Sequence, residues 1–304
     1  MKRNLIRIIQ YVFIIIFVYG CTEEVDIDLP ESEQKIFVNG YLNPGQDIQL
    51  SLFYSKPNPL DTSDYKPVDN AEVKIFHKDS LFCELSYNDS PGEYSDKPPV
   101  YVAKNVKPRV GKKYRLHVNV PGHKTISAET IVPGNTKIDT VEHQLISRNY
   151  SKYIHCNITF QDEPEQKNFY YFNTITHKEN DDFYSDDPLF DGEYYLFEIP
   201  YLVFNDELIN GESYTLGIDL FRTRIDSTIF RLFTITEGCF LYLESVNKQK
   251  SKDDFPIEDI EINIPITEPV QIYSNIKNGL GIFAGINESS KTVYFNYDEK
   301  KSDK

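Results

Sequence analysis

The chain contains no tryptophan, and its one methionine is Met1. Cysteine is scarce as well: Cys21 lies near the start, and Cys83, Cys156 and Cys239 follow in the rest of the chain. The three that follow Cys21 are an odd number, so they cannot form a closed set of disulfides in an oxidising compartment. Cys83 and Cys156 alternate with aliphatic residues in "SLFCELSY" and "YIHCNITF". We therefore interpret all three as small core side chains.

Basic residues are also few, with 32 lysines and arginines against 47 aspartates and glutamates. Lys2, Arg3 and Arg7 lie at the very start, and without them 29 basic residues remain, which gives a net charge of about −18. Such a chain repels nucleic acid and anionic lipid head groups, so we expect neither as a partner.

The longest apolar run follows this basic start. Residues 8–19 are apolar except for Gln10, which is shorter than the roughly 20 residues that span a bilayer. This order is typical of a secretory signal peptide. The run ends in Gly20-Cys21, with Val18 at an aliphatic position, and resembles a bacterial lipoprotein cleavage site, although Tyr19 departs from the small residue usual there.

We therefore expect a signal peptide over residues 1–20 and acyl chains on Cys21, which would anchor the chain to a membrane. A transmembrane anchor or a plain cleaved signal are the alternatives. An acidic tether over residues 21–34 follows. Its Glu23 and Glu24 resemble the export signal that sends Bacteroidota lipoproteins to the outer face of the outer membrane; a merely solvated tether is the other interpretation.

The rest of the chain predicts a mainly β protein, because tyrosine and phenylalanine are abundant and short alternating runs are separated by turn residues. In "GKKYRLHVNVPGHKTISAETIVP", apolar and polar residues alternate on both sides of a Pro-Gly turn. Six or seven such strands over residues 35–134 predict an immunoglobulin-like β-sandwich.

A turn at Pro133-Gly134-Asn135 marks a boundary, after which residues 135–298 predict a second antiparallel β domain, and residues 299–304 a charged tail. This domain has one short helix near 235–248. Thr234 and Glu237 resemble a capping box at its start, and the residues that share one helical face are Cys239, Tyr242, Leu243 and Val246.

The end of this domain, "VQIYSNIKNGLGIFAGINESS", predicts a β-hairpin that turns at Asn278-Gly279. Gly281 and Gly285 flank Phe283 on one strand face, which permits close backbone approach or an aromatic ring lying across them. A ligand site at these glycines is the less favoured alternative.

The acidic start, "FVNGYLNPGQDIQLSL", the order "NAEVKIF … GEY … GKKYRLHVNVPGH … AETIVP" and the closing "EPVQIYSNIKNGLGIFAG" together resemble domain of unknown function 4249. This is a Bacteroidota lipoprotein family whose genes commonly lie beside outer-membrane TonB-dependent receptors. The resemblance covers roughly residues 21–296. It implies an outer-membrane location and a TonB-dependent receptor as partner, but no chemistry.

An acidic loop interrupts the second domain, with carboxylates at Glu179, Asp181, Asp182, Asp186, Asp187, Asp191 and Glu193. Its irregular spacing lacks the ladder of a calcium loop, and a solvated loop is favoured over a cation site. Phe183, Tyr184, Leu189 and Phe190 are interleaved with the acids. We take Phe183, Tyr184 and Phe190 as candidate contacts for a partner protein; the alternative is that they fill the domain's own core.

No catalytic motif stands out, and the six histidines lack metal-ligand spacing. We therefore expect no catalytic residues, no metal and no cofactor. Three short segments, at Asp79-Ser80-Leu81, Asp139-Thr140-Val141 and Asp226-Ser227-Thr228, resemble an O-glycosylation sequon of the same phylum.

The expected function is that of a non-enzymatic, surface-exposed lipoprotein that serves a TonB-dependent receptor as an accessory or ligand-capture subunit. A cell-surface adhesin or structural binding module is the alternative. A surface hydrolase is a third hypothesis, and it requires a cleft of convergent polar groups with perturbed pKa values.

Overall fold

The computed structural model describes residues 33–56, 63–89, 98–148, 151–176, 179–190, 201–221, 226–253 and 270–295. The chain divides into two units, residues 1–33 with 56–62 and residues 34–55 with 63–304. All named strands and the helix lie in the second unit. Cys21, Glu23 and Glu24 lie outside the described residues, so their predicted roles stay predictions.

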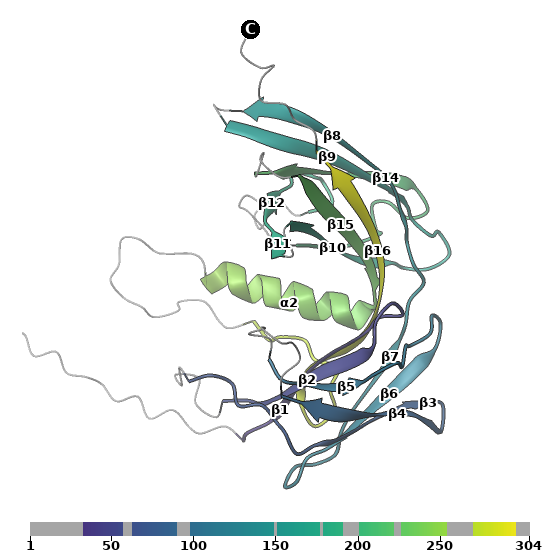
Figure 1. The fold of residues 1–304 in the computed structure, drawn as a ribbon, viewed down its shortest axis with the longest axis vertical. Helices are drawn as coiled ribbons and strands as arrows, with labels where there is room; N and C mark the ends of the chain where they lie inside the picture. The colour runs from purple at the N-terminus through teal and green to yellow at the C-terminus, as the bar shows by residue number, and fades with distance from the viewer. Residues whose placement is uncertain are drawn as a thin grey trace, which may run out of the picture. The chain divides into compact units, whose positions relative to one another are not determined.

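The described chain is mainly β, as the sequence predicts. Its strands form a twelve-stranded sheet and a four-stranded sheet, with one helix besides (Figure 1). The strands of the N-terminal part are β1 (Ile36–Leu42), β2 (Ile48–Tyr54), β3 (Glu72–His77), β4 (Ser80–Asn88), β5 (Val100–Ala103), β6 (Lys113–Asn119) and β7 (Ile126–Ile131).

The remaining elements follow β7 along the chain. They are β8 (Ile138–Arg148), β9 (Ser151–Gln161), β10 (Phe169–Thr176), β11 (Glu179–Asp181), β12 (Phe183–Tyr184), β13 (Leu202–Asn205), β14 (Ser213–Leu220), β15 (Ser227–Ile235), the helix α2 (Glu237–Asp253) and β16 (Leu280–Tyr294). The small sheet has the order β12-β14-β9-β8, and all its pairs are antiparallel.

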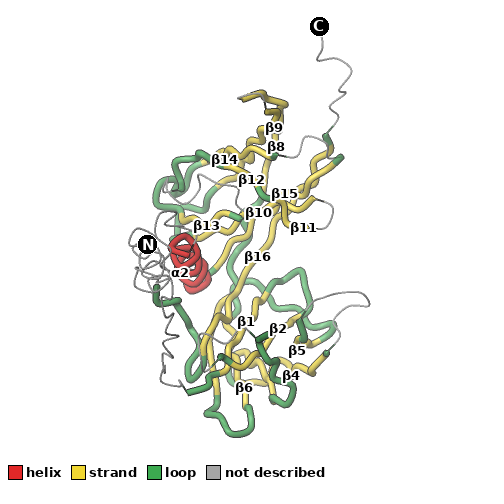
Figure 2. The backbone as a smooth tube through the Cα atoms, turned by 90° about the vertical axis from the view of Figure 1, so that its left-hand side faces the viewer, coloured by secondary structure: helices red, strands yellow, loops and turns green. Residues whose placement is uncertain are grey.

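The large sheet has the order β11-β10-β15-β16-β1-β2-β5-β4-β3-β6-β7, with β13 also paired to β10. Strand β16 joins the two parts of this sheet: it pairs with β15 antiparallel and with β1 parallel, and Figure 2 shows it running between these two strands. The sheet is therefore continuous across the predicted boundary at residue 134. The prediction of an immunoglobulin-like sandwich within this sheet stays a prediction.

The alternation of apolar residues places a core on one side of the N-terminal strands. Tyr114, Leu116 and Val118 of β6 are buried, together with residues from β1 to β5 and β7. Edge strand β7 returns to β16, where the Gly285 amide donates to Thr130 Oγ1 at 2.7 Å. Cys83, Cys156 and Cys239 are all buried free thiols, which confirms their prediction as core side chains.

The predicted helix is present as α2, but its predicted cap is wrong. The amide of Phe240 donates to the carbonyl of Thr236 at 3.0 Å, so the helix starts after Thr236. Thr234 is still in strand β15, and its hydroxyl accepts the amide of Thr136 at 3.1 Å. Among the described residues, no helix is long and apolar enough to cross a membrane.

The predicted C-terminal hairpin is also wrong. Residues 270–276 form no strand, and Lys277 makes only an isolated bridge to Ser127. Asn278 does adopt a positive φ of 61°, but it leads into β16 rather than closing a hairpin. The close backbone approach predicted at the glycines is confirmed, since a Cβ on Gly281 would lie 2.0 Å from the Val38 carbonyl oxygen.

Candidate functional site

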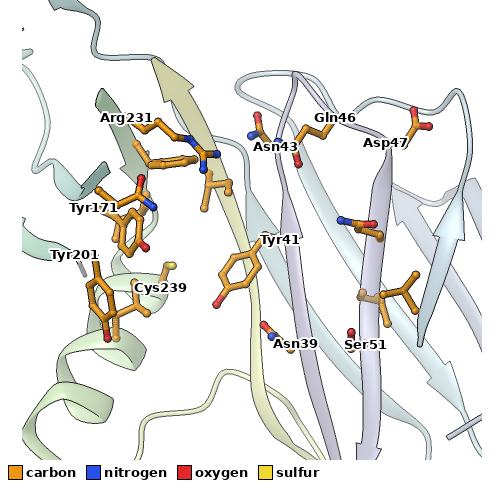
Figure 3. A pocket seen from close by; sticks show the side chains of 18 residues that line it. Asn39, Tyr41, Asn43, Gln46, Asp47, Ser51, Tyr171, Tyr201, Arg231 and Cys239 are labelled. Carbon is orange, nitrogen blue, oxygen red and sulfur yellow. The ribbon is translucent and has the colours of Figure 1, made fainter. Parts of the chain in front are cut away.

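A cavity of about 480 Å³ opens on one face of the large sheet (Figure 3). We call it the tyrosine cavity. Strands β1, β2, β10, β15 and β16 contribute side chains to it, and α2 and Tyr201 complete it. Its lining includes Asn39, Tyr41, Asn43, Gln46, Asp47, Gln49, Ser51, Tyr171, Asn173, Tyr201, Arg231, Phe233, Cys239 and Leu243.

The strand pairing explains why these side chains share one face. Tyr171 of β10 is opposite Phe233 of β15, which is opposite Glu288 of β16. On the other side of β16, Asn39 and Tyr41 of β1 are opposite Ser51 and Gln49 of β2. Because side chains alternate between the two faces of a sheet, residues two apart on each strand point into the same cavity.

Aromatic rings form the wall on the side of β10 and the helix. The rings of Tyr171 and Tyr201 stack with centroids 5.2 Å apart and an interplanar angle of 26°. Phe233 meets Tyr171 edge-on at 5.4 Å. Beneath them, Cys239 of α2 is buried. Burial raises the pKa of the Cys239 thiol to about 12 and that of the Tyr171 hydroxyl to about 12, so both groups are neutral at physiological pH.

Amide and hydroxyl side chains form the opposite wall, on β1 and β2 (Figure 3). Asn43 is held in place, because its Oδ1 accepts the Gly45 amide at 3.1 Å and its Nδ2 donates to Glu288 at 3.4 Å. The amide side chains of Asn39, Gln46 and Gln49 make no hydrogen bond to the described part of the chain. They are therefore available to a bound molecule.

Tyr41 lies between the two walls (Figure 3). Burial is the first cause that raises the pKa of its hydroxyl, and the nearby Cys239, Tyr242, Tyr171 and Tyr201 add to it. No hydrogen bond joins this hydroxyl to the described residues. A neutral phenol at the centre of the cavity can both donate and accept a hydrogen bond.

Arg231 is the one cation among the described lining residues, and it is already paired. Arg231 binds Glu288 with two hydrogen bonds, Nε to Oε1 at 2.7 Å and a terminal nitrogen to Oε2 at 2.9 Å. The same guanidinium lies 4.6 Å from the centroid of Phe233. Asp47 accepts the backbone amide of Asn105 at 3.1 Å. The arrangement offers aromatic surface, neutral hydrogen-bonding groups and, at Asp47, one carboxylate.

The structure does not place the predicted partner contacts Phe183 and Phe190 on the surface. Phe183 and Phe190 are buried within the core of the second β region, which settles the open choice in favour of core filling. The prediction that they form an exposed contact surface is wrong, because each ring packs against another core ring, Phe172 and Phe204 respectively. Tyr184 is half-buried.

The acidic loop is partly structural. Asp187 is buried, and its carboxylate accepts hydrogen bonds from the amides of Leu189 and Gly217 and from the hydroxyl of Tyr214. Asp182 and Asp186 are exposed. Asp191 and Glu193 lie outside the described residues. Within the described ranges, no three histidine, cysteine or acidic side chains gather where they could hold a metal ion.

One histidine has a carboxylate partner. His155 Nδ1 lies 2.6 Å from Asp219 Oδ1, across the β9–β14 pair of the small sheet. This pair lies on the small sheet, and neither residue is among those that line the tyrosine cavity.

The sequence did not predict the tyrosine cavity. Its local signal is weak: "FVNGYL" and "IQLSLFY" place polar residues, Asn39, Gln49 and Ser51, on one side of strands that otherwise have apolar character. Their aromatic counterparts, Tyr171 and Tyr201, come more than 100 positions later. Only the order of strands in the sheet brings the two groups together.

A model of the family described as "Domain of unknown function (DUF4249)" matches residues 22–292. A search of curated proteins found no match. Among solved structures, Salmonella alpha-2-macroglobulin reacted with methylamine is similar, with 10% identity and a TM-score of 0.24. The similarity covers 72% of this chain and only 15% of that protein's length.

Proposed function

The chain belongs to the DUF4249 family, and from this premise we propose that it is a surface-exposed outer-membrane lipoprotein. In this proposal it serves a TonB-dependent receptor as a non-enzymatic ligand-capture subunit. The chain would hold a ligand outside the membrane and pass it to the receptor, which performs the transport.

The tyrosine cavity is the observation that carries the proposal. Its volume of about 480 Å³ lies in the range of ligand sites, which are concave and combine apolar walls with a few polar groups. The free amide side chains of Asn39, Gln46 and Gln49 face stacked tyrosines across it. Such a site binds and orients a molecule.

The amino terminus supports the membrane part of the proposal. A basic start, a short apolar run and Gly20-Cys21 are the parts of a lipoprotein signal. Acyl chains contribute about 0.8 kcal/mol per buried methylene, and two or more chains give stable anchoring. Glu23 and Glu24 support export to the outer face.

Co-purification from outer membranes tests the proposal. The tagged lipoprotein is solubilised in mild detergent and captured, and the bound proteins are identified by mass spectrometry. We expect a β-barrel receptor to co-purify. A Cys21→Ser variant expressed in the same cells serves as the control, and we expect it to recover much less receptor because it is not anchored beside it.

Absence of any β-barrel receptor from the captured material would refute the receptor part. If deletion of the gene then abolished attachment of the cells to a surface, the adhesin alternative would hold instead.

A further inference from the structure

We propose that the tyrosine cavity binds a neutral carbohydrate chain, with one sugar ring held between the tyrosine wall and the amide wall. This inference deepens the proposed function and rests on it for its biological role. The binding itself is a property of the isolated protein, so it is tested separately.

The charges around the cavity disfavour an anionic ligand, and two of its ring faces are closed to a cationic one. Arg231 is committed to Glu288 by two hydrogen bonds, which leaves it little capacity for an anion. The chain's net charge of −15 adds a general repulsion of anions. Cations of the chain already lie at the aromatic rings: Arg231 is 4.6 Å from the centroid of Phe233, and Lys250 is 5.9 Å from that of Tyr201. The faces of Phe233 and Tyr201 that a cationic ligand would use are therefore already taken.

The amide wall fits hydroxyl groups. Each carboxamide of Asn39, Gln46 and Gln49 carries one acceptor oxygen and an NH₂ donor. A sugar hydroxyl also donates and accepts, so each amide can make a pair of hydrogen bonds to neighbouring hydroxyls of one ring. The side-chain oxygen of Ser51, at the base of the wall, adds another group with both functions.

The aromatic wall fits the other surface of a sugar. A pyranose ring presents C–H groups on its faces, and these pack on the faces of aromatic side chains with dispersion and with attraction to the π electrons. Tyr171 and Tyr201 are held in place by stacking on each other and by the hydrogen bond from the Tyr201 hydroxyl to Asn247 Oδ1 at 2.6 Å. The contact with a sugar falls on the remaining ring surface that lines the cavity.

Tyr41 is the point where the two walls meet. Its hydroxyl has no partner among the described residues and is neutral. Removing water from an unpaired phenol costs free energy unless a partner replaces the water. A ligand hydroxyl in the centre of the cavity would supply that partner.

The same sheet face continues beyond the cavity, which favours a chain of sugars over a single one. Ile229 lies two residues from Arg231 on β15, and Tyr294 lies on the same face of β16 as Glu288. Their exposed fractions are 37% and 72%. These apolar side chains offer further contact to sugar units that leave the cavity.

A peptide fits less well. Peptides that bind sheets add a strand at an edge and use backbone hydrogen bonds. The cavity instead lies on the sheet's face, flanked by paired strands from β10 to β2, whose backbone groups are used within the sheet.

Isothermal titration calorimetry on the full mature lipoprotein tests the proposal. The protein is held in a zwitterionic detergent without a sugar head group, because glycosidic detergents would compete. The probes are maltohexaose, cellohexaose, laminarihexaose and xylohexaose, with oligogalacturonate as the anionic probe, chitosan hexamer as the cationic probe and a neutral hexapeptide.

We expect saturable one-to-one binding of at least one neutral hexasaccharide and none of the charged probes. Tyr41→Phe removes only the hydroxyl and should weaken binding about three- to tenfold, as the net value of one hydrogen bond requires. Gln49→Ala should weaken it by a similar factor. Gln144→Ala, an exposed glutamine on β8 of the other sheet, is the matched control and should bind like the unmodified chain.

No saturable binding of any neutral hexasaccharide would overturn the proposal. So would binding that Tyr41→Phe and Gln49→Ala leave unchanged, or binding of the hexapeptide or a charged probe in place of a sugar. In each case a receptor that still co-purifies would leave the proposed function standing with another ligand.

Discussion

At the scale of single residues, the proposed ligand site depends on tyrosines that are placed between core and solvent. Tyr41, Tyr171 and Tyr201 all pack against the cluster that includes Cys239 and Phe233, yet all three line the cavity. A tyrosine in a strand pattern reads as a core residue, because the sequence does not show which end of the ring is buried. The sequence therefore did not predict the tyrosine site, although it did predict the buried cysteines.

The buried thiols give a residue-scale prediction. Burial raises the pKa of Cys83 to about 11 and those of Cys156 and Cys239 to about 12. Because only the thiolate attacks a disulfide reagent, we expect the folded chain with acylated Cys21 to react very slowly with Ellman's reagent at mildly alkaline pH.

In concentrated guanidinium chloride, all three thiols should react at once. If even one equivalent of thiol in the folded protein reacted rapidly with the reagent, the burial of these side chains would be contradicted. If one thiol does react in the folded protein, the Cys239→Ser variant shows whether it is Cys239, which lines the cavity.

At the scale of elements, β16 connects the parts of the large sheet. Its glycines were predicted to allow close backbone approach, and they do, because a Cβ at Gly285 would lie 1.9 Å from the carbonyl oxygen of Ile131. Its pairing was not predicted. The Asn278-Gly279 dipeptide favours a hairpin locally, but the parallel pairing of β16 with β1 joins Phe37 to Leu280, a long-range contact that local turn signals do not encode.

We expect Gly285→Ala to destabilise the protein by about 3 kcal/mol, because a methyl group there overlaps backbone atoms of β7's end that cannot move without breaking the sheet. Gly134→Ala is the matched control. A Cβ at Gly134 meets nothing within 4 Å, so the change should alter the free energy of unfolding by less than about 0.5 kcal/mol.

Urea denaturation followed by circular dichroism measures both variants. Equal stability of the two would mean that β16 does not pass as closely against β7 as described.

At the scale of the whole molecule, the sequence predicted a mainly β chain and its one helix, but it divided the chain near residue 134. The continuous sheet places β1 and β2 beside β15 and β16 and so creates the tyrosine cavity. Local patterns predict strands, since alternation records which face is buried. They do not predict the order of strands, which depends on contacts between distant segments.

The buried tyrosines make the stability of the molecule fall at alkaline pH. Burial raises the pKa of Tyr171 from 10.0 to about 12, and raises the pKa values of Tyr41 and Tyr170 further. Above about pH 10 the unfolded chain ionises these phenols while the folded chain keeps its protons, so rising pH favours unfolding. Below the ordinary pKa neither state ionises and this effect vanishes.

We therefore expect the urea midpoint to be constant up to about pH 9 and to fall above about pH 10, because the free energy of unfolding there decreases by about 1.4 kcal/mol for each tyrosine and each pH unit. A midpoint that stays constant to about pH 11 would show that these hydroxyls are not held neutral by the fold.

We propose that acyl chains on Cys21 anchor the chain, with its cavity, outside the cell. Mass spectrometry of the protein purified from its own membranes tests it most directly. We expect the N-terminal fragment to begin at Cys21 with a mass increased by two or three fatty acyl chains, and the Cys21→Ser variant to leave the membrane fraction. An unmodified Cys21, or a serine variant that remains with the membranes, would contradict the account.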